Sequence, residues 1–291
     1  MNVIEVKNLT KDYGSGRGVF DVNLAVKQGE VFGFLGPNGA GKSTTIRHLM
    51  GFSKPDKGET YIFGKPTFDK YYEILSKVGY IPGEIALPQG LTGWEFIRMM
   101  QNLQGVKNEE MLDKMLKLFE LDDIALRGET KRMSLGVKRK LAVVTAFMSD
   151  PEVLILDEPT SGLDPVMQEV FVNFIHEEKA RGKTILLSSH IFSEIDSTCD
   201  RIAIIKDGRI VSEFVADDLK HASLKYYSVK FASDADEKRF ETESKKLSSL
   251  NLIAKEEDGG IKMSLEDKDL NAFIALLSDC NASEFSNRRE T

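Results

Sequence analysis

The sequence predicts an α/β protein with a central, mostly parallel sheet, followed by a smaller α+β domain. Three observations support this fold class. Short apolar runs at residues 31–35 and 153–156 fit buried strands, and polar residues follow each run directly. The first run leads through a glycine-rich stretch, GPNGAGKST at 36–44, into a helical pattern. From residue 226 onward the pattern changes to a new alternation of short strands and helices.

Composition narrows the functional class. The chain has 291 residues, with 41% hydrophobic residues, enough for a full core, and a formal net charge of −7. This charge argues against a nucleic-acid partner bound through a general basic field. Cys199 and Cys280 follow no metal or redox spacing, so we expect reduced thiols in a cytosolic protein. The N-terminus shows no secretion pattern, and the apolar runs fall short of the roughly 18 residues of a membrane span.

The first strands are expected to form a separate layer. Residues 3–9, 19–26 and 59–64 alternate between apolar and polar side chains. This period is typical of strands with one buried face. We expect them to open the domain as a mostly antiparallel β-layer.

The stretch at 36–44 has the pattern of a phosphate-binding loop. It follows a predicted strand and precedes a helix with apolar spacing at Ile46, Leu49 and Met50, which is the context that G-x-x-x-x-G-K-[ST] requires. Glycines let successive N–H groups curl around phosphate oxygens, and the helix N-terminus adds free donors and partial positive charge. We expect Lys42 to reach the β- and γ-phosphates and Ser43 to bind Mg²⁺. The contacting residues would be Gly36, Pro37, Asn38, Gly39, Ala40, Gly41, Lys42, Ser43 and Thr44.

A second predicted strand, 153–156, ends in two carboxylates. Ligands of open parallel sheets bind at the carboxyl ends of the strands. Asp157 is therefore placed to hold Mg²⁺, and Glu158 to take a proton from, or orient, a water that attacks the γ-phosphate. The alternative is that Glu158 is a solvated carboxylate after a strand.

Four segments together resemble one family. The phosphate loop is followed by MSLGVKRKL at 133–141, LILDEPTSGLDP at 154–165 and LLSSH at 186–190. This order resembles the nucleotide-binding subunits of ATP-binding cassette (ABC) transporters over about residues 1–222. The resemblance implies a P-loop NTPase core with an antiparallel β-subdomain and a helical lobe, the latter at about 84–150.

The resemblance also implies function and partners. It predicts an ATPase that uses ATP and Mg²⁺ and pairs head to tail with an identical chain or a close paralogue. Each ATP would lie between the phosphate loop of one chain and Ser134–Gly136 of the other. A separate transmembrane permease would hold the pair at the cytoplasmic face of the cell membrane.

Further site residues follow from this resemblance. Tyr13 corresponds to the aromatic residue that stacks on adenine, although it could be an ordinary loop tyrosine. His190 corresponds to the histidine near the γ-phosphate. Asp164 falls in the segment that touches the partner subunit, and with Pro165 it also has the pattern of a helix cap.

The family's Leu-Ser-Gly-Gly-Gln segment is altered in this chain. Residues 133–137 are Met-Ser-Leu-Gly-Val, so Ser134 and Gly136 remain while the first glycine and the glutamine are replaced. Ser134 at a helix start would give a second anion site. The alternative is an ordinary serine cap followed by three solvated basic side chains, Lys138, Arg139 and Lys140.

A second departure concerns the Mg²⁺ site. After the strand that includes VGYIP at 78–82, the family usually has a glutamine that contacts Mg²⁺ and the attacking water, and here Gly83 and Glu84 follow. Gln89 does not occupy the matching place. Glu84 could substitute as a carboxylate, or the link could be absent.

The remaining segments complete the predicted fold. Residues 93–121 have helical apolar spacing, and Trp94, Phe96 and Met100 would either pack the helical lobe or line a groove for a helix of the membrane partner. Residues 201–214 are typical of a hairpin around Asp207-Gly208. Residues 226–291 predict a small βαββα(β) domain that resembles the C-terminal extensions of some ABC exporter ATPases.

The sequence favours a subunit that drives export of a drug, peptide or lipid-like substrate. This preference rests on the Ser-Leu-Gly variant and the C-terminal extension, by analogy. Two alternatives remain: a soluble ABC-type ATPase that acts on ribosomes or DNA, and a nucleotide-gated scaffold without hydrolysis. The acidic net charge argues against the first, and Glu158 with His190 argues against the second.

Overall fold

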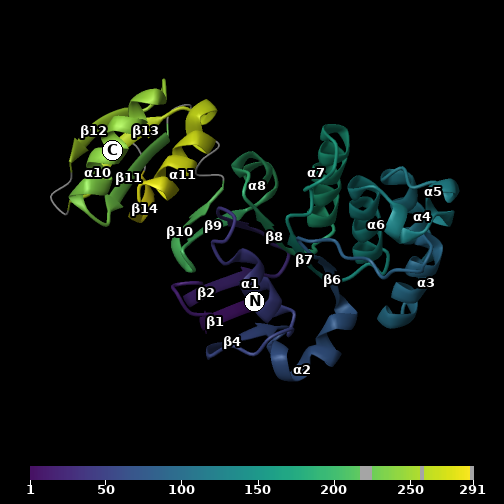
Figure 1. Ribbon diagram of the computed structural model, residues 1–291. Helices are drawn as coiled ribbons and strands as arrows, with labels where there is room; N and C mark the ends of the chain where they lie inside the picture. Colours follow the sequence, from purple (N-terminus) through teal and green to yellow (C-terminus); the bar gives the residue numbers. More distant parts are fainter. Residues whose placement is uncertain (217–224, 256–258, 289–291) are drawn as a thin grey trace.

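The described residues form three sheets: an N-terminal antiparallel layer, a central sheet and a C-terminal sheet (Figure 1). The structure is a computed structural model, and it describes residues 1–216, 225–255 and 259–288. The predicted boundary between residues 222 and 226 lies mostly outside the described residues.

The first sheet is the antiparallel layer that the N-terminal alternation predicts. Its strand order is β2 (Gly18–Lys27), β1 (Asn2–Asp12), β4 (Lys57–Ile62) and β5 (Lys65–Pro66). Helix α1 (Lys42–Leu49) contacts this layer through β2 and β4, and it contacts the central sheet through β7. Ile46, Leu49 and Met50 are buried there, as their helical spacing predicts.

The central sheet has six strands, and all neighbours are parallel except one edge pair. The order is β10 (Arg209–Val215), β9 (Arg201–Lys206), β3 (Val31–Leu35), β8 (Thr184–Ser189), β7 (Val153–Asp157) and β6 (Val78–Ile81). The antiparallel β9–β10 pair is the predicted hairpin, and Asp207 and Gly208 at its turn both have positive φ, +47° and +74°. β3 places Phe32 and Phe34 in the core facing the antiparallel layer and Val31 and Leu35 in the core on the other face.

The segment between β6 and β7 is helical. Its helices are α3 (Gly93–Gln104), α4 (Glu109–Leu118), α5 (Asp123–Arg127) and α6 (Leu135–Phe147), with a 3-10 turn at Thr130–Arg132. The prediction of one helical stretch over 93–121 is wrong in detail. Gly105 ends α3 in the left-handed region at φ +70°, and the Asn108 side chain caps α4. Phe96 is buried, and Trp94 and Met100 pack against the core.

Helix α2 (Thr67–Ile74) contacts β4 and β5 of the antiparallel layer. Helix α8 (Phe192–Thr198) contacts β3 and β8 of the central sheet, and α7 (Pro165–Ala180) packs against α8. A short 3-10 turn, Leu75–Lys77, leads from α2 into β6.

Residues from 225 onward form the third sheet. Its strand order is β12 (Asn251–Lys255), β13 (Ile261–Leu265), β11 (Lys225–Phe231) and β14 (Ala282–Arg288), with helices α10 (Asp234–Glu243) and α11 (Leu270–Asp279) and 3-10 turns at Ser244–Lys246 and Asp267–Asp269. Along the chain the elements run β-α-β-β-α-β, the order that the sequence predicts. This unit contacts the central sheet where β14 packs against β10. One cavity between them is lined by Pro37, Ile274 and Leu277, so α11 lies near the start of the phosphate loop.

Candidate nucleotide site

The glycine-rich loop connects β3 to the first turn of α1. Gly41 precedes the helix in the left-handed region at φ +111°, and an added Cβ would lie 2.7 Å from Val19 Cγ1. Only glycine fits this position without strain. Because the first N–H groups of a helix have no partner within it, the start of α1 offers donors to an anion.

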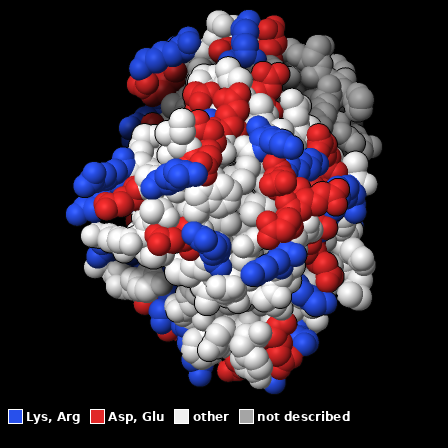
Figure 2. Space-filling view, turned by 90° about the vertical axis from the view of Figure 1, so that its right-hand side faces the viewer, with Lys and Arg blue, Asp and Glu red and all other residues white. Residues whose placement is uncertain are grey.

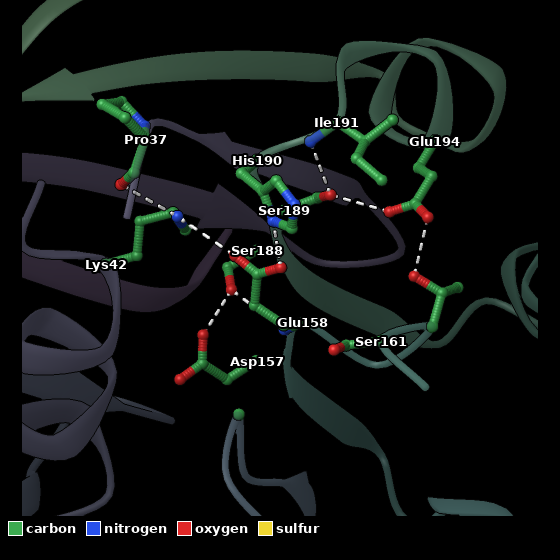
Figure 3. Close-up of polar contacts among 12 residues, drawn as sticks. Pro37, Lys42, Asp157, Glu158, Ser161, Ser188, Ser189, His190, Ile191 and Glu194 are labelled. Carbon is green, nitrogen blue, oxygen red and sulfur yellow. Dashed lines mark hydrogen bonds and ion pairs between the residues drawn. The ribbon is translucent and has the colours of Figure 1, made fainter. Parts of the chain in front are cut away.

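Lys42 extends between the loop and Glu158 (Figure 3), and its side chain is buried. Its Nζ donates to the carbonyls of Gly36 at 2.6 Å and Pro37 at 3.2 Å. Nζ also lies 3.1 Å from Oε1 of Glu158. Oε1 accepts no well-aligned hydrogen bond among the described residues, so the contact is an ion pair without hydrogen-bonding geometry. The lysine is thus held beside the loop by contacts that a phosphate could replace.

The two carboxylates lie at the carboxyl end of β7 and point in different directions: Asp157 is its last residue, and Glu158 follows it. Asp157 is buried, and its Oδ1 accepts a hydrogen bond of 2.5 Å from Ser188 Oγ on the neighbouring strand β8. Glu158 has φ +50°, a left-handed conformation that is rare for a residue with a side chain. Its backbone N–H is held by Ser188 Oγ and by the Ser188 carbonyl, each at 3.2 Å. This turn sends the two carboxylates to different parts of the site.

His190 completes a chain of contacts that begins at Lys42. Its Nδ1 lies 2.6 Å from Oε2 of Glu158, so the glutamate bridges the lysine and the histidine (Figure 3). The histidine follows directly after β8, and its side chain is 43% exposed, which leaves room for contact with a ligand.

Glu194 on α8 links the two loops that carry Glu158 and His190, and no sequence motif had indicated it. Its Oε2 accepts a hydrogen bond of 2.7 Å from Ser189 Oγ, and its Oε1 accepts one of 2.8 Å from Thr160 Oγ1. Ser189 precedes His190, and Thr160 follows Glu158 by two residues. Glu194 thus ties the loop of the histidine to the loop of the glutamate.

These groups surround one cavity of about 610 Å³. Residues from the sequence prediction that line it are Pro37, Asn38, Gly39, Gly41, Lys42, Ser43, Thr44, Asp157, Glu158 and His190. Gly36 lies outside this lining, where an added Cβ would lie 2.4 Å from the Ile205 carbonyl, and Ala40 is buried behind the loop. The lining fits a nucleotide with a divalent cation: backbone donors and a lysine for the phosphates, and a hydroxyl and a carboxylate, hard oxygen ligands, for the metal.

Comparison with known proteins identifies the family. The family model described as ABC transporter matches residues 19–161. The bacitracin transport ATP-binding protein BcrA of Bacillus licheniformis is 40% identical over 229 residues, which cover 77% of this chain and 73% of that protein. The chain belongs to the ABC transporter ATP-binding proteins. It is therefore an ATPase subunit that binds and hydrolyses ATP.

Other relatives of this ABC protein extend the match. An uncharacterized ABC transporter ATP-binding protein of Bacillus subtilis is 32% identical over 278 residues, 94% of this chain and 88% of that protein, so the match continues past residue 225. A solved ATP-binding subunit of an ABC transporter is 34% identical with a TM-score of 0.69, covering 75% of this chain and 92% of that one. A second solved structure, a dimeric ATP-binding cassette with ADP and Pi, is 27% identical with a TM-score of 0.66, covering 73% and 98%.

Besides Gly36 and Ala40, four further predicted residues of this ABC protein lie outside the cavity lining. Tyr13 is 55% exposed in the turn after β1. Ser134 caps α6, where its Oγ accepts from the Val137 N–H at 3.3 Å, and Asp164 caps α7 in the same way at 2.9 Å. Gly136 lies in the first turn of α6, where an added Cβ would lie 3.2 Å from the Gly162 carbonyl. The local cap predictions for Ser134 and Asp164 are confirmed, and within one chain these residues do not join the nucleotide cavity.

The altered loop after β6 lies against the Mg²⁺ candidate. An added Cβ at Gly83 would lie 3.0 Å from Oδ2 of Asp157, so glycine lets the backbone approach this carboxylate closely. Glu84 lines the nucleotide cavity. Tyr80 on β6 is mostly buried, and burial, followed by the Asp157 charge, raises the pKa of its hydroxyl to about 12.

The structure corrects the reading of Arg139 as a solvated charge. Its side chain is buried at 2% exposure, and its guanidinium donates to three backbone carbonyls. Burial lowers the pKa of Arg139, while the charges of Asp157 and Glu158 oppose this change. No sequence pattern indicated this burial, because Arg139 lies between two lysines in a basic run.

Proposed function

We propose that this subunit works as a head-to-tail pair that clamps two ATP molecules and drives a separate membrane permease. The observation that carries the proposal is the convergence of Lys42, Asp157, Glu158 and His190 on the cavity at the carboxyl ends of β3, β7 and β8. Ser134 and Gly136 lie outside that cavity in their own chain, and in the family such residues cap the ATP of the partner. A solved relative is a dimer bound to ADP and Pi, which supports pairing.

Each residue has a role in this proposal. Backbone N–H groups of residues 38–44 surround the phosphates, and Lys42 leaves Glu158 for the β- and γ-phosphates. Ser43 and Asp157 hold Mg²⁺, which neutralises charge on the phosphates when bound. Glu158, oriented by His190, accepts a proton from the attacking water. Tyr13 stacks on adenine, and Ser134, Gly136 and Asp164 act across the pair.

A permease must supply the membrane path in this proposal. Within the described ranges, no helix combines the length and apolar character needed to cross a bilayer. In this proposal the pair sits at the cytoplasmic face of the membrane, bound to the permease. The helical face seen in Figure 2 carries acidic and basic side chains interspersed, without the single-sign field that nucleic-acid binding requires.

Export is the direction that we propose, with a drug, peptide or lipid-like substrate. Relatives are named for bacitracin transport, for multidrug transport in Escherichia coli and for Nod factor export in Burkholderia orbicola. These names support export over an activity on ribosomes or DNA.

Two experiments test the proposal. Glu158→Gln should bind MgATP without turning it over and should elute as a dimer in size-exclusion chromatography with ATP, while the wild-type chain without nucleotide elutes as a monomer. A Glu158→Gln variant that stays monomeric at every ATP concentration would contradict the clamp. Affinity purification from detergent-solubilised membranes should recover a multi-span membrane protein, and recovery of ribosomes instead would overturn the permease assignment.

A further inference from the structure

Arg139 is a buried cation without a carboxylate at salt-bridge distance among the described residues. It lies in the second turn of α6, and its guanidinium donates hydrogen bonds to backbone carbonyls instead. Nε donates to Ser161 at 2.8 Å, Nη1 to Pro82 at 2.9 Å and Nη2 to Gly83 at 2.7 Å. Burial of a charged group is costly unless it is well hydrogen-bonded, and these three contacts offset that cost.

The three carbonyls belong to two loops that border the nucleotide site. Pro82 and Gly83 follow β6, and Ser161 follows Glu158 by three residues. All three residues line the nucleotide cavity, whereas Arg139 does not. The guanidinium therefore lies behind the cavity wall, where it ties together two loops that approach the site from different strands.

The loop after β6 is held against the Mg²⁺ candidate. With Gly83 in place, backbone rather than a side chain meets Asp157, and an added Cβ would lie 3.0 Å from Oδ2. A small shift of this loop would therefore change the space around Asp157, and a shift at Ser161 would move the turn that carries Glu158. Both shifts are opposed by the same planar group.

Arginine suits this place better than lysine. Its donors are fixed in one plane and point in several directions, so one side chain can serve three carbonyls at once. A lysine ammonium is a single point at the end of a flexible chain, and it cannot reach the same three acceptors with the same geometry.

We infer that Arg139 is a positioning residue for ATP hydrolysis, which fixes the Pro82–Gly83 and Ser161 backbones around the two carboxylates in place of the side-chain link that a residue at 83 would provide. This inference rests on the proposed function of Asp157 and Glu158. It assigns Arg139 no contact with the nucleotide. Removal of the guanidinium should therefore slow turnover and leave nucleotide binding nearly intact.

The test compares Arg139→Gln, Arg139→Lys and a control, Lys140→Gln, which removes a positive charge from the next, partly exposed position of α6. Turnover and KM are measured by phosphate release, and Kd with a fluorescent ATP analogue. Arg139→Gln should lower kcat about 10²-fold, because misplacement by about 1 Å has an effect of this order. KM and Kd should change less than about threefold, Arg139→Lys should recover only part of kcat, and Lys140→Gln should match wild type.

Hydrogen–deuterium exchange of the nucleotide-free chain gives a readout that is independent of turnover. Amides at 83–86 and 160–163 should exchange faster in Arg139→Gln than in wild type, while those of β3 and α7 stay unchanged. A wild-type kcat in either Arg139 variant would overturn the inference, as would unchanged exchange in both loops. Equal losses in kcat, Kd and melting temperature would show a general structural role and also overturn it. An inactive wild-type chain would instead refute the proposed function, and the exchange experiment would still test Arg139.

Discussion

Replacing Glu158 with glutamine should tighten ATP binding while it stops turnover. In the structure Lys42 Nζ lies 3.1 Å from Glu158 Oε1, so the lysine must leave the carboxylate before it can contact a phosphate. The amide keeps the shape of the side chain and an oxygen toward His190, but it removes the charge that competes for Lys42. The same charge would repel an incoming γ-phosphate, so both effects act in one direction.

The separation of the two charges gives an upper bound on the gain. Coulomb's law gives about 5 kcal/mol for unit charges at 3.1 Å with an effective dielectric constant of about 20, which is an upper bound. Desolvation opposes most of this energy, and Oε1 has no aligned hydrogen bond, so we take about 1.4 kcal/mol as the net value. This value corresponds to about a tenfold lower Kd for ATP. Loss of a general base should lower kcat by about 10²–10⁴-fold.

Fluorescence titration with an ATP analogue, at protein concentrations below those of dimer formation, measures the affinity. Single-turnover phosphate release measures the chemical step. Glu84→Gln is the matched control, because it removes a carboxylate from the same cavity without touching the Lys42 pair. An unchanged or weaker affinity in Glu158→Gln would show that the ion pair does not oppose binding, and turnover above a tenth of wild type would refute the base assignment.

Three further predictions concern single side chains. Lys42→Ala should abolish tight ATP binding because its cation faces the loop, and an equilibrium titration with wild-type affinity would rule out this role. Glu84→Ala should lower steady-state turnover less than Glu158→Gln does, and an equal loss would show that Glu84 acts in the chemistry. Burial is the main cause that lowers the pKa of His48, whose ring is 1% exposed, so the unfolded chain takes up a proton first as pH falls. The melting temperature should therefore fall as pH drops below about 6.5, and this fall should be smaller in His48→Asn than in the exposed-histidine control His176→Asn; equal profiles would contradict the assignment.

The sequence predicted the parts of the site that depend on local pattern. The apolar runs at 31–35 and 153–156 became β3 and β7, and polar groups lie at the carboxyl end of each. Because the carboxyl ends of parallel strands lie at one edge of the sheet, the polar groups that follow them had to lie close together. The helix caps at Ser134 and Asp164 could also be predicted from the sequence, because a cap depends on residues within one turn.

The parts that could not be predicted depend on contacts between distant segments. Arg139 bonds to carbonyls 56, 57 and 22 positions away, and backbone carbonyls leave no mark in a sequence. Glu194 similarly acts through hydroxyls at Thr160 and Ser189 that any surface loop could carry. Gly105 and Asn108 are residue types that end and start helices, so the break between α3 and α4 could have been predicted. The apolar spacing on both sides of the break instead suggested one continuous helix.

Helix α6 carries Ser134 at its start and Arg139 five residues later, a separation of about 7.5 Å at roughly 1.5 Å per residue. In a paired assembly, the N-terminus of α6 would contact the γ-phosphate bound by the partner. The same helix would hold the Pro82–Gly83 and Ser161 loops of its own site through Arg139. ATP binding at one site would then change the ATP affinity of the other site. Thermodynamic linkage requires that the second site change the affinity of the first by the same factor. Sigmoidal ATP dependence that becomes hyperbolic in Arg139→Lys would express this linkage, and a Hill coefficient of one in the wild type would contradict it.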